Sequence, residues 1–220
     1  MDLPPDPVKR RYDAAGRRSR AEQARRRVLD VARALFTGDG YAATTMAAIA
    51  AAAGVSVESI YKTHGSKARL ALALFHRAIA GQDAEPAEVR ADRLSAEERD
   101  PVRRLRAFGA LVGEVTPRVA PLMLLVRTAA AGDPELADVW EQMLDERLER
   151  MAGHARRLAE AGHLRPGVTV EEARDVLWLY SAPEVYELMV DRRGWSPERF
   201  GAWVGGTYVA ALVDRSSQLS

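Results

Sequence analysis

Cysteine is absent from this sequence, aromatic residues make up only 6% of it, and no long apolar run stands out. The absence of cysteine excludes a disulfide framework and any metal site built from thiolates. A membrane-spanning helix needs about twenty consecutive apolar residues, and we find no run of that length. The first residues, MDLPPDPVKRR, also lack the apolar segment of a secretory signal. We therefore expect a cytoplasmic protein that does not associate with membranes.

Motifs of catalysis and of cofactor binding are missing too. We find no glycine-rich phosphate loop and no Gly-x-Ser-x-Gly turn that would present a nucleophilic serine. His76, His154 and His163 are isolated and lack the spacing of metal ligands. The acidic cluster in residues 145–149 is interleaved with arginines, which is typical of a solvated helix face. The sequence therefore favours a protein that is not an enzyme and that holds no metal or other cofactor.

The net charge of +1 conceals an asymmetry along the chain. Residues 1–80 carry 14 basic and 7 acidic side chains, whereas residues 81–220 carry 18 basic and 24 acidic ones. A basic N-terminal part attracts phosphate backbones, and an acidic remainder is repelled by them. The asymmetry is typical of a nucleic-acid-binding protein, although basic tails also serve solubility.

Residues 44–67, TTMAAIAAAAGVSVESIYKTHGSK, have the spacing of a helix-turn-helix. Gly54 can adopt the left-handed backbone conformation that ends a first short helix. The side chain of Ser56 can accept a hydrogen bond from a free backbone N–H and so begin a second helix. Apolar residues supply the side by which the two helices pack, namely Ile49, Ala50, Ala53, Val55 and Ile60. The pattern alone is equally compatible with an ordinary helical hairpin.

Residues 20–80 resemble the N-terminal domain of the TetR family of one-component transcriptional regulators. The matching segments, in order, are ALFTGDGYAATTM, IAAAAGVSVESIYKTHGSK and the apolar ARLALALFHRAI. The resemblance implies an all-α protein in which a three-helix helix-turn-helix domain and a linking fourth helix precede a larger helical bundle. That bundle would bind an effector and form the dimer. The C-terminal part resembles the family only in length and helical character.

The helix-turn-helix and the resemblance together predict the residues that contact double-stranded DNA. The second helix of the motif would lie in the major groove, where Tyr61, Lys62 and Thr63 reach backbone or base edges. Lys67 would pair with a phosphate. The full predicted set combines the arm, the start of the first short helix and the second short helix: Arg17, Arg18, Arg20, Thr44, Thr45, Ser56, Val57, Glu58, Ser59, Tyr61, Lys62, Thr63, His64 and Lys67.

His64 departs from the family pattern, which usually has an aromatic residue, most often phenylalanine, before the Gly-Ser-Lys that opens the fourth helix. Histidine packs less apolar surface but can stack or form hydrogen bonds, and partial burial would lower its pKa. We interpret His64 first as a packing residue and second as a phosphate contact.

The basic arm before the first helix also has two interpretations. Its arginines could follow a phosphate backbone or enter a minor groove. Because Pro4, Pro5, Pro7 and Gly16 oppose regular structure, residues 1–18 would otherwise be a disordered, solvated tail.

Every later segment has helical periodicity, and none has the alternation of a strand. We predict a first helix from Ser19 or Arg20 to Thr37, and later helices over 101–115, 118–131, 134–162, 170–181, 183–192 and 197–214. Pro183 could instead kink one continuous helix. The predicted divisions are a disordered basic arm over 1–18, a DNA-binding domain over 19–80, a polar linker over 81–100 and an effector-binding and dimerisation domain over 101–220.

The apolar residues of this last domain suit either a ligand pocket or a core. Pockets between bundled helices are mostly apolar, with a few polar groups that orient the ligand. The resemblance favours a cavity for a small apolar effector, and our candidates are Met123, Trp140, Met143, Leu144, Trp178 and Tyr180.

The last two helical regions are the predicted dimer interface. The resemblance implies that they pair with the same helices of a second copy, which would make a homodimer with a near-palindromic operator. The candidates are Val185, Leu188, Met189, Trp203, Val204, Tyr208 and Leu212.

Two hypotheses about function follow. The first is a dimeric transcriptional regulator, a repressor rather than an activator, whose operator binding is released by a small molecule. The alternative is a helical small-molecule-binding protein with an inactive DNA-binding head, which His64 and the alanine-rich stretch in residues 47–53 motivate.

Overall fold

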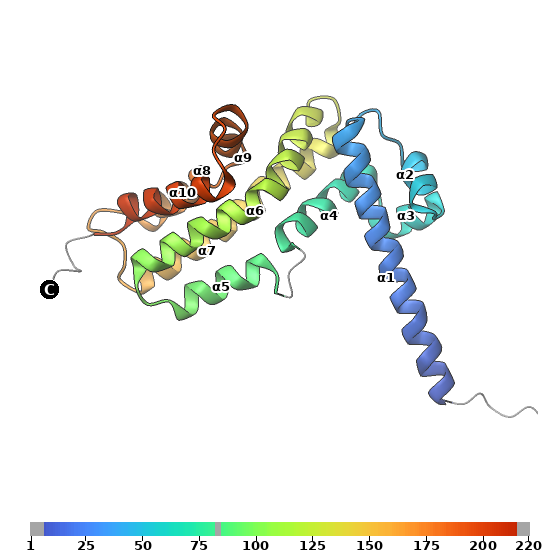
Figure 1. Ribbon diagram of the computed structural model, residues 1–220, viewed down its shortest axis with the longest axis horizontal. Coiled ribbons are helices and arrows are strands. Elements are labelled where there is room, and N and C mark those ends of the chain that lie inside the picture. The colour runs from blue at the N-terminus through green and yellow to red at the C-terminus, as the bar shows by residue number, and fades with distance from the viewer. Residues whose placement is uncertain (1–6, 82–84, 215–220) are drawn as a thin grey trace, which may run out of the picture. The chain divides into compact units, whose positions relative to one another are not determined.

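The computed structural model describes residues 7–81 and 85–214, with the backbone alone for residues 7–18 (Figure 1). The described residues form helices and connecting turns, with no β-strand among them, which confirms the predicted all-α class. The chain divides into two compact units, Met1–Ala73 and Leu74–Ser220. The division falls inside a helix, so it differs from the predicted boundary at residue 80.

The first unit contains α1 (Pro7–Gly38), α2 (Met46–Ala53), α3 (Val57–His64) and the first half of α4 (Lys67–Ala80). Its core consists of apolar side chains from all four helices, among them Ala32, Phe36, Ile49, Ile60 and Leu70, each at most 1% exposed. The start of α1 at Pro7 corrects our prediction of a disordered arm for residues 7–18, and residues 1–6 of the predicted arm lie outside the described residues. The helix begins at Pro7 because proline suits a first turn, and the alanines and arginines that follow are good helix formers.

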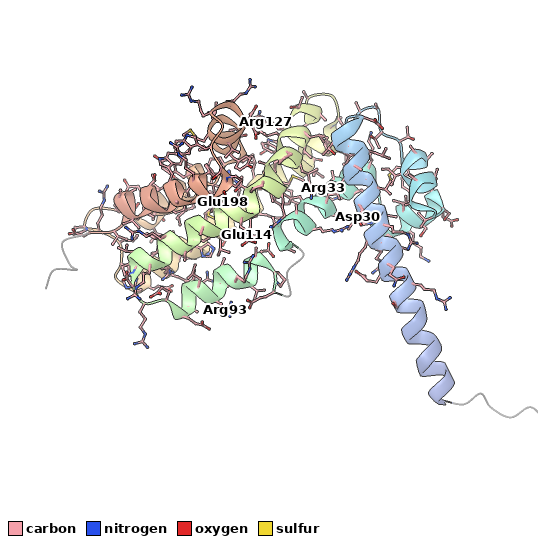
Figure 2. All side chains as sticks on the ribbon, in the orientation of Figure 1. Asp30, Arg33, Arg93, Glu114, Arg127 and Glu198 are labelled. Atoms are coloured by element: carbon pink, nitrogen blue, oxygen red, sulfur yellow. The ribbon has the colours of Figure 1, made fainter. Side chains whose placement is uncertain are left out.

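The second unit opens with the rest of α4 and with α5 (Ala87–Glu97), where we predicted a linker. This prediction was wrong because it looked for large apolar residues, whereas α5 packs through Ala87 and Ala91, both buried. Figure 2 labels Glu114, which lies on the helix after α5. An ion pair between Arg90 and Glu114 joins α5 to this helix, with a second hydrogen bond of 2.9 Å between the same side chains.

Helix α6 (Pro101–Ala130) runs through the gap that we placed between two helices. Pro117 and Pro121 lie inside it, and each removes a backbone donor. The helix continues because apolar side chains on both sides of the prolines, such as Val112 and Met123, are buried. By length and composition, with a mean hydropathy of 1.4, α6 could also cross a membrane, contrary to our expectation that no segment is apolar enough. Half of that apolar window is buried inside the protein, as expected of a core helix.

The remaining helices are α7 (Pro134–Glu160), α8 (Val170–Tyr180), α9 (Pro183–Tyr186), the π-helix η1 (Glu187–Arg192) and α10 (Pro197–Leu212). Thr169 begins α8 with a full capping box, in which Glu172 bonds back to the Thr169 N–H. Ala182 has an extended backbone, so the chain is broken between α8 and α9 rather than kinked at Pro183.

Helices α6 and α10 lie side by side in Figure 1 and touch through glycines. A Cβ atom added to Gly109 would lie 2.3 Å from the backbone nitrogen of Gly205, and one added to Gly113 would lie 2.6 Å from the Pro197 carbonyl oxygen. Side chains at these positions would force the two backbones apart. This contact supports the core of the second unit, which includes Phe108 and the fully buried Tyr208.

Candidate functional site

Both ends of the turn between α2 and α3 have the geometry that the sequence predicted. Gly54 ends α2 with φ of 65°, in the left-handed region. The Ser56 side chain begins α3 by accepting a hydrogen bond of 3.1 Å from the Ser59 N–H. Thr45 begins α2 in the same way through the Ala48 N–H. These caps hold two eight-residue helices in a helix-turn-helix arrangement.

One face of α3 is polar and open to solvent. Ile60 is buried and anchors the helix to the core of the first unit, while Tyr61 is 49% exposed. Five further side chains on α3 and its N-cap are exposed and can donate or accept hydrogen bonds, namely Ser56, Glu58, Ser59, Lys62 and Thr63. Val57 is half-buried. This face offers donors, acceptors and one cation to a bound phosphate backbone or base edge.

Two residues predicted to contact DNA have roles inside the first unit, and their contact with DNA stays a prediction. The Lys67 ammonium donates to the carbonyl oxygens of Tyr41 and Thr44 at 2.9 and 3.0 Å, and it lies 4.1 Å from the centre of the Tyr41 ring. Thr44 is buried, and its hydroxyl donates to the Gly40 carbonyl at 2.8 Å. Sequence spacing placed both residues near the motif. It could not show that the loop before α2, which contains Thr44, folds onto the Lys67 side chain. Thr45, by contrast, is exposed.

His64 is half-buried at the end of α3. Burial lowers its pKa, and the charge of Arg25 lowers it further. Its Nε2 atom is buried without a hydrogen-bond partner among the described residues. A neutral, half-buried imidazole supports the packing interpretation more than the phosphate contact.

Three arginines at the N-terminal side of α1 are predicted DNA contacts, namely Arg17, Arg18 and Arg20. Arg20 is exposed on α1. The side chains of Arg17 and Arg18 lie outside the described residues, so their predicted DNA contacts stay predictions.

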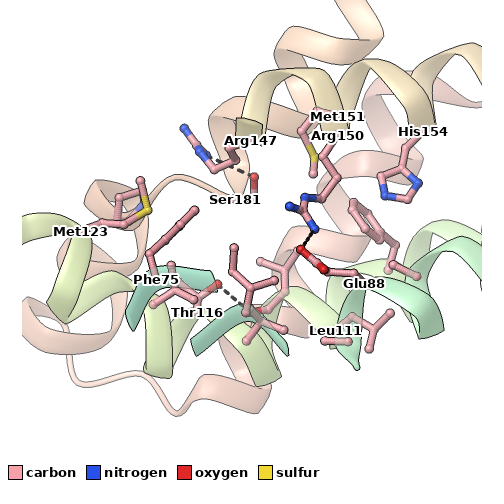
Figure 3. A pocket seen from close by; sticks show the side chains of 18 residues that line it. Phe75, Glu88, Leu111, Thr116, Met123, Arg147, Arg150, Met151, His154 and Ser181 are labelled. Carbon is pink, nitrogen blue, oxygen red and sulfur yellow. Dashed lines mark hydrogen bonds and ion pairs between the residues drawn. The ribbon is translucent and has the colours of Figure 1, made fainter. Parts of the chain in front are cut away.

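The second unit contains an apolar cavity of about 110 Å³ (Figure 3). Helices α4 to α7 line it, together with Ser181 and Pro183 after α8. Most of the lining is hydrocarbon, such as Phe75, Phe108 and Val112. The cavity is therefore of the kind that holds small apolar ligands.

Ionisable side chains lie along one side of this cavity (Figure 3). Arg150 of α7 is ion-paired with Glu88 of α5. Burial lowers the pKa of His154 to about 4, with a further contribution from the charge of Arg157, so this imidazole is neutral at neutral pH. Its Nδ1 atom lies 2.9 Å from the Ser95 hydroxyl. Arg147 donates to the Trp178 carbonyl oxygen at 2.7 Å and to the Ser181 hydroxyl at 3.3 Å.

Only one of the predicted effector residues lines the cavity, namely Met123. Met143 is fully buried and Trp140, Leu144, Trp178 and Tyr180 are half-buried, all away from the lining. Met143 belongs to the buried core, and Trp178 and Tyr180 pack against the core of the second unit. Helix α4 was predicted as an apolar linking helix of the first domain and α5 as part of a linker, so neither was considered as a wall of the cavity.

The predicted dimer residues divide into core and surface. Val204, Tyr208 and Leu212 are fully buried within the second unit, so they cannot meet a partner. Val185, Met189 and Trp203 are half-buried against the same core. Leu188 is 59% exposed, and the neighbouring helix α8 exposes Leu179 at 51%. Periodicity marked the apolar faces, but it cannot tell a face covered by the chain itself from one covered by a second copy.

These features define the class of the protein. A capped helix-turn-helix whose second helix presents a polar face is a DNA-reading unit, and here it is followed by a helical unit with an apolar cavity. Residues 28–74 match the family model of the bacterial regulatory proteins of the tetR family. The N-terminal part of the chain is thus similar to the DNA-binding domain of this family, as the resemblance implied. No curated protein matches the sequence.

Solved structures of regulators share the fold over most of the chain. The complex of SmeT with triclosan has a TM-score of 0.68 and 24% identity, and covers 87% of this chain and 92% of its own. SmeT is the repressor of the Stenotrophomonas maltophilia multidrug efflux pump SmeDEF. NalD, the secondary repressor of the MexAB-OprM pump of Pseudomonas aeruginosa, has a TM-score of 0.67 and 21% identity, and covers 89% and 99%. A Saccharomonospora viridis regulator in complex with choline has a TM-score of 0.59 and 21% identity, and covers 88% and 100%.

Proposed function

We propose that this protein is a transcriptional repressor that binds DNA through α3 and releases it when a small molecule occupies the cavity of the second unit. The observation that carries the proposal is the exposed polar face of α3 on a correctly capped helix-turn-helix. SmeT and NalD, which share the fold, are repressors, and SmeT was solved with the small molecule triclosan. They support repression as the mode of action and ligand binding as its control.

The repressor would act as a homodimer on a near-palindromic operator. Two-fold symmetry places the same helix on each half of the DNA site, with centres about 35 Å apart or somewhat more. The exposed Leu179 and Leu188, on α8 and η1, are the apolar surface of the second unit that favours such pairing. An effector in the cavity would then change the separation of the two DNA-reading units.

A regulator of this kind acts in the cytoplasm and needs no catalytic group. The described residues contain no cluster of three or more histidine, aspartate and glutamate side chains that could hold a metal ion. The regulators of similar fold support a protein that is not an enzyme.

The alternative, a ligand-binding protein with an inactive DNA head, is not favoured. The alanine-rich helix α2 packs through Ile49, Ala50 and Ala53, which are all buried, and leaves α3 in place. His64 disturbs neither helix cap, since Gly65 still ends α3 by bonding to the Tyr61 carbonyl.

Selection from a pool of randomised double-stranded DNA tests the proposal, and it works for an operator of any sequence. We expect enrichment of a two-fold symmetric site whose binding weakens steeply as salt rises. A pool that stays random after several rounds, with a protein that is folded by circular dichroism, would overturn the proposal.

A further inference from the structure

Arg147 stands out among the charges along the cavity because no carboxylate compensates it. No carboxylate of the described residues lies within ion-pair distance of its guanidinium. Glu184 contributes some electrostatic attraction from further away, but it forms its own ion pair with Arg127 at 2.8 Å. Arg150 is neutralised by Glu88, and His154 is uncharged at neutral pH. The cavity lining therefore carries one net positive charge, on Arg147.

The surroundings orient this guanidinium without neutralising it. It donates to the carbonyl oxygen of Trp178, at the end of α8, and lies 4.4 Å from the centre of the Trp178 ring. The Trp178 carbonyl group and the Trp178 ring are both uncharged. Burial lowers the pKa of Arg147 to about 10, so the group remains a cation at neutral pH. Its Nε atom is buried and has no hydrogen-bond partner among the described residues.

A buried cation with a free donor is costly unless something bonds to it. An arginine presents its donors in a planar fork that matches the two oxygens of a carboxylate. The rest of the lining is hydrocarbon, from residues such as Phe75, Val112 and Met123. The cavity of about 110 Å³ is comparable in size with one of roughly 150 Å³ that holds benzene, so it suits an apolar body of one ring or a short branched chain.

We propose that the effector of this repressor is an apolar monoanion, a small hydrocarbon body with one carboxylate, whose acid group pairs with Arg147 while its body fills the cavity. This inference rests on the proposed function and gives the chemical class of its effector. It selects against neutral and cationic molecules of the same shape, because only an anion compensates the guanidinium.

The test compares matched ligands on the full-length protein by isothermal titration. Benzoate is set against benzyl alcohol and benzylamine, and cyclohexanecarboxylate against the corresponding alcohol and amine. We expect at least one acid to bind tenfold or more tightly than both of its partners. Acids that bind no more tightly than their alcohols and amines would overturn the proposal.

The substitution Arg147→Gln shows whether this side chain carries the preference. Glutamine keeps a polar side chain with a hydrogen-bond donor but removes the charge, so we expect the acid preference to fall below threefold. Arg156→Gln is the matched control, because Arg156 is an exposed arginine of the same helix, paired with Glu149. An acid preference that survives Arg147→Gln would assign the site elsewhere and refute our proposal.

A second measurement does not depend on the variant folding. In the wild-type protein, the Nε–H resonance of Arg147 should shift with the acid and stay in place with the alcohol. A resonance unmoved by a saturating acid would contradict the proposed pairing. Neither experiment contains DNA, so a failure here leaves DNA binding intact, and a failure of the repressor proposal appears only in the DNA selection.

Discussion

Lys67, which the sequence predicted as a phosphate contact, also has a role in the fold. Its ammonium bonds to two carbonyl oxygens of the loop before α2 and lies over the Tyr41 ring. Hydrogen bonds to a charged group contribute about 1.5–3 kcal/mol each at most, less where solvent reaches them. The loop between α1 and α2 is therefore held from the start of α4.

We predict that Lys67→Met destabilises the first unit by about 1–3 kcal/mol. The matched control is Lys62→Met, which removes the same charge from an exposed position and should cost less than about 0.5 kcal/mol. Hydrogen exchange of the α2 and α3 amides measures both. Equal protection in the two variants would show that the Lys67 contacts contribute nothing.

His154 makes the stability of the second unit depend on pH. Burial depresses its pKa to about 4 in the folded chain, against about 6.5 when unfolded, so the unfolded chain binds more protons between these values. Stability is therefore fully present above about pH 6.5 and falls as the pH drops toward 4. The loss is on the order of 3–4 kcal/mol at most, at about 1.4 kcal/mol for each unit of pKa difference.

The check is urea unfolding at several pH values, with the second unit followed by its tryptophan fluorescence. His154→Gln removes the titrating group and should flatten the curve between about pH 6.5 and 4, apart from the contribution of acidic residues. If the wild type and the variant lose stability in parallel over this range, the linkage to His154 is wrong.

At the scale of whole elements, the α6–α10 contact depends on glycine. A methyl group on Gly109 would collide with the α10 backbone at 2.3 Å, and backbone cannot move aside as a flexible side chain can. Gly109 is on α6, whereas Gly206 is on α10, and a Cβ atom added to Gly206 would meet nothing within 4 Å. The two positions share a residue type and a helical setting, and they differ only in what surrounds them.

We predict that Gly109→Ala destabilises the second unit by about 3 kcal/mol or more, since overpacking costs about 1–3 kcal/mol even where side chains can adjust. Gly206→Ala should instead stabilise it by up to about 1 kcal/mol, because alanine favours a helix over glycine. Thermal unfolding followed by circular dichroism measures the difference. A Gly109→Ala protein as stable as the Gly206→Ala protein would contradict the close approach.

The elements differ in how far their sequence determined them. Gly54 and Ser56 predicted the turn between α2 and α3 correctly, because left-handed glycine and side-chain capping are local effects. Helix α6 was divided in two because Pro117 is locally unfavourable, while the burial that overrides it comes from distant helices. The same limit applies to α5, whose buried face is made of alanines. Local chemistry was predictable, and tertiary burial was not.

The candidate sites show the same division. The exposed positions of α3 follow from its amphipathic pattern, so Tyr61 and Lys62 could be predicted. The cavity depends on which side chains from α4 to α7 converge, and only Met123 was anticipated. Arg147 could not have been singled out, because the sequence contains 29 arginines and does not show which of them lack a carboxylate.

At the scale of the whole molecule, one chain carries a helix-turn-helix unit and a helical unit with an apolar cavity. The central claim is that the exposed face of α3 binds the operator. Side chains on that face differ from those of the core in one testable respect, since their removal should change DNA affinity and leave the fold intact. Tyr61 and Lys62 are the largest exposed side chains there.

The measurement that tests this claim most directly is the affinity of the double variant Tyr61→Ala/Lys62→Ala for the operator found by selection, read by fluorescence anisotropy. We predict a loss of at least about tenfold, because one good contact to a base or phosphate contributes about 1–3 kcal/mol. Thermal stability should stay within a few degrees of the wild type, and Arg156→Ala, which removes an exposed charge from the second unit, should bind normally. A double variant that binds the operator as tightly as the wild type would contradict the claim that α3 reads the DNA.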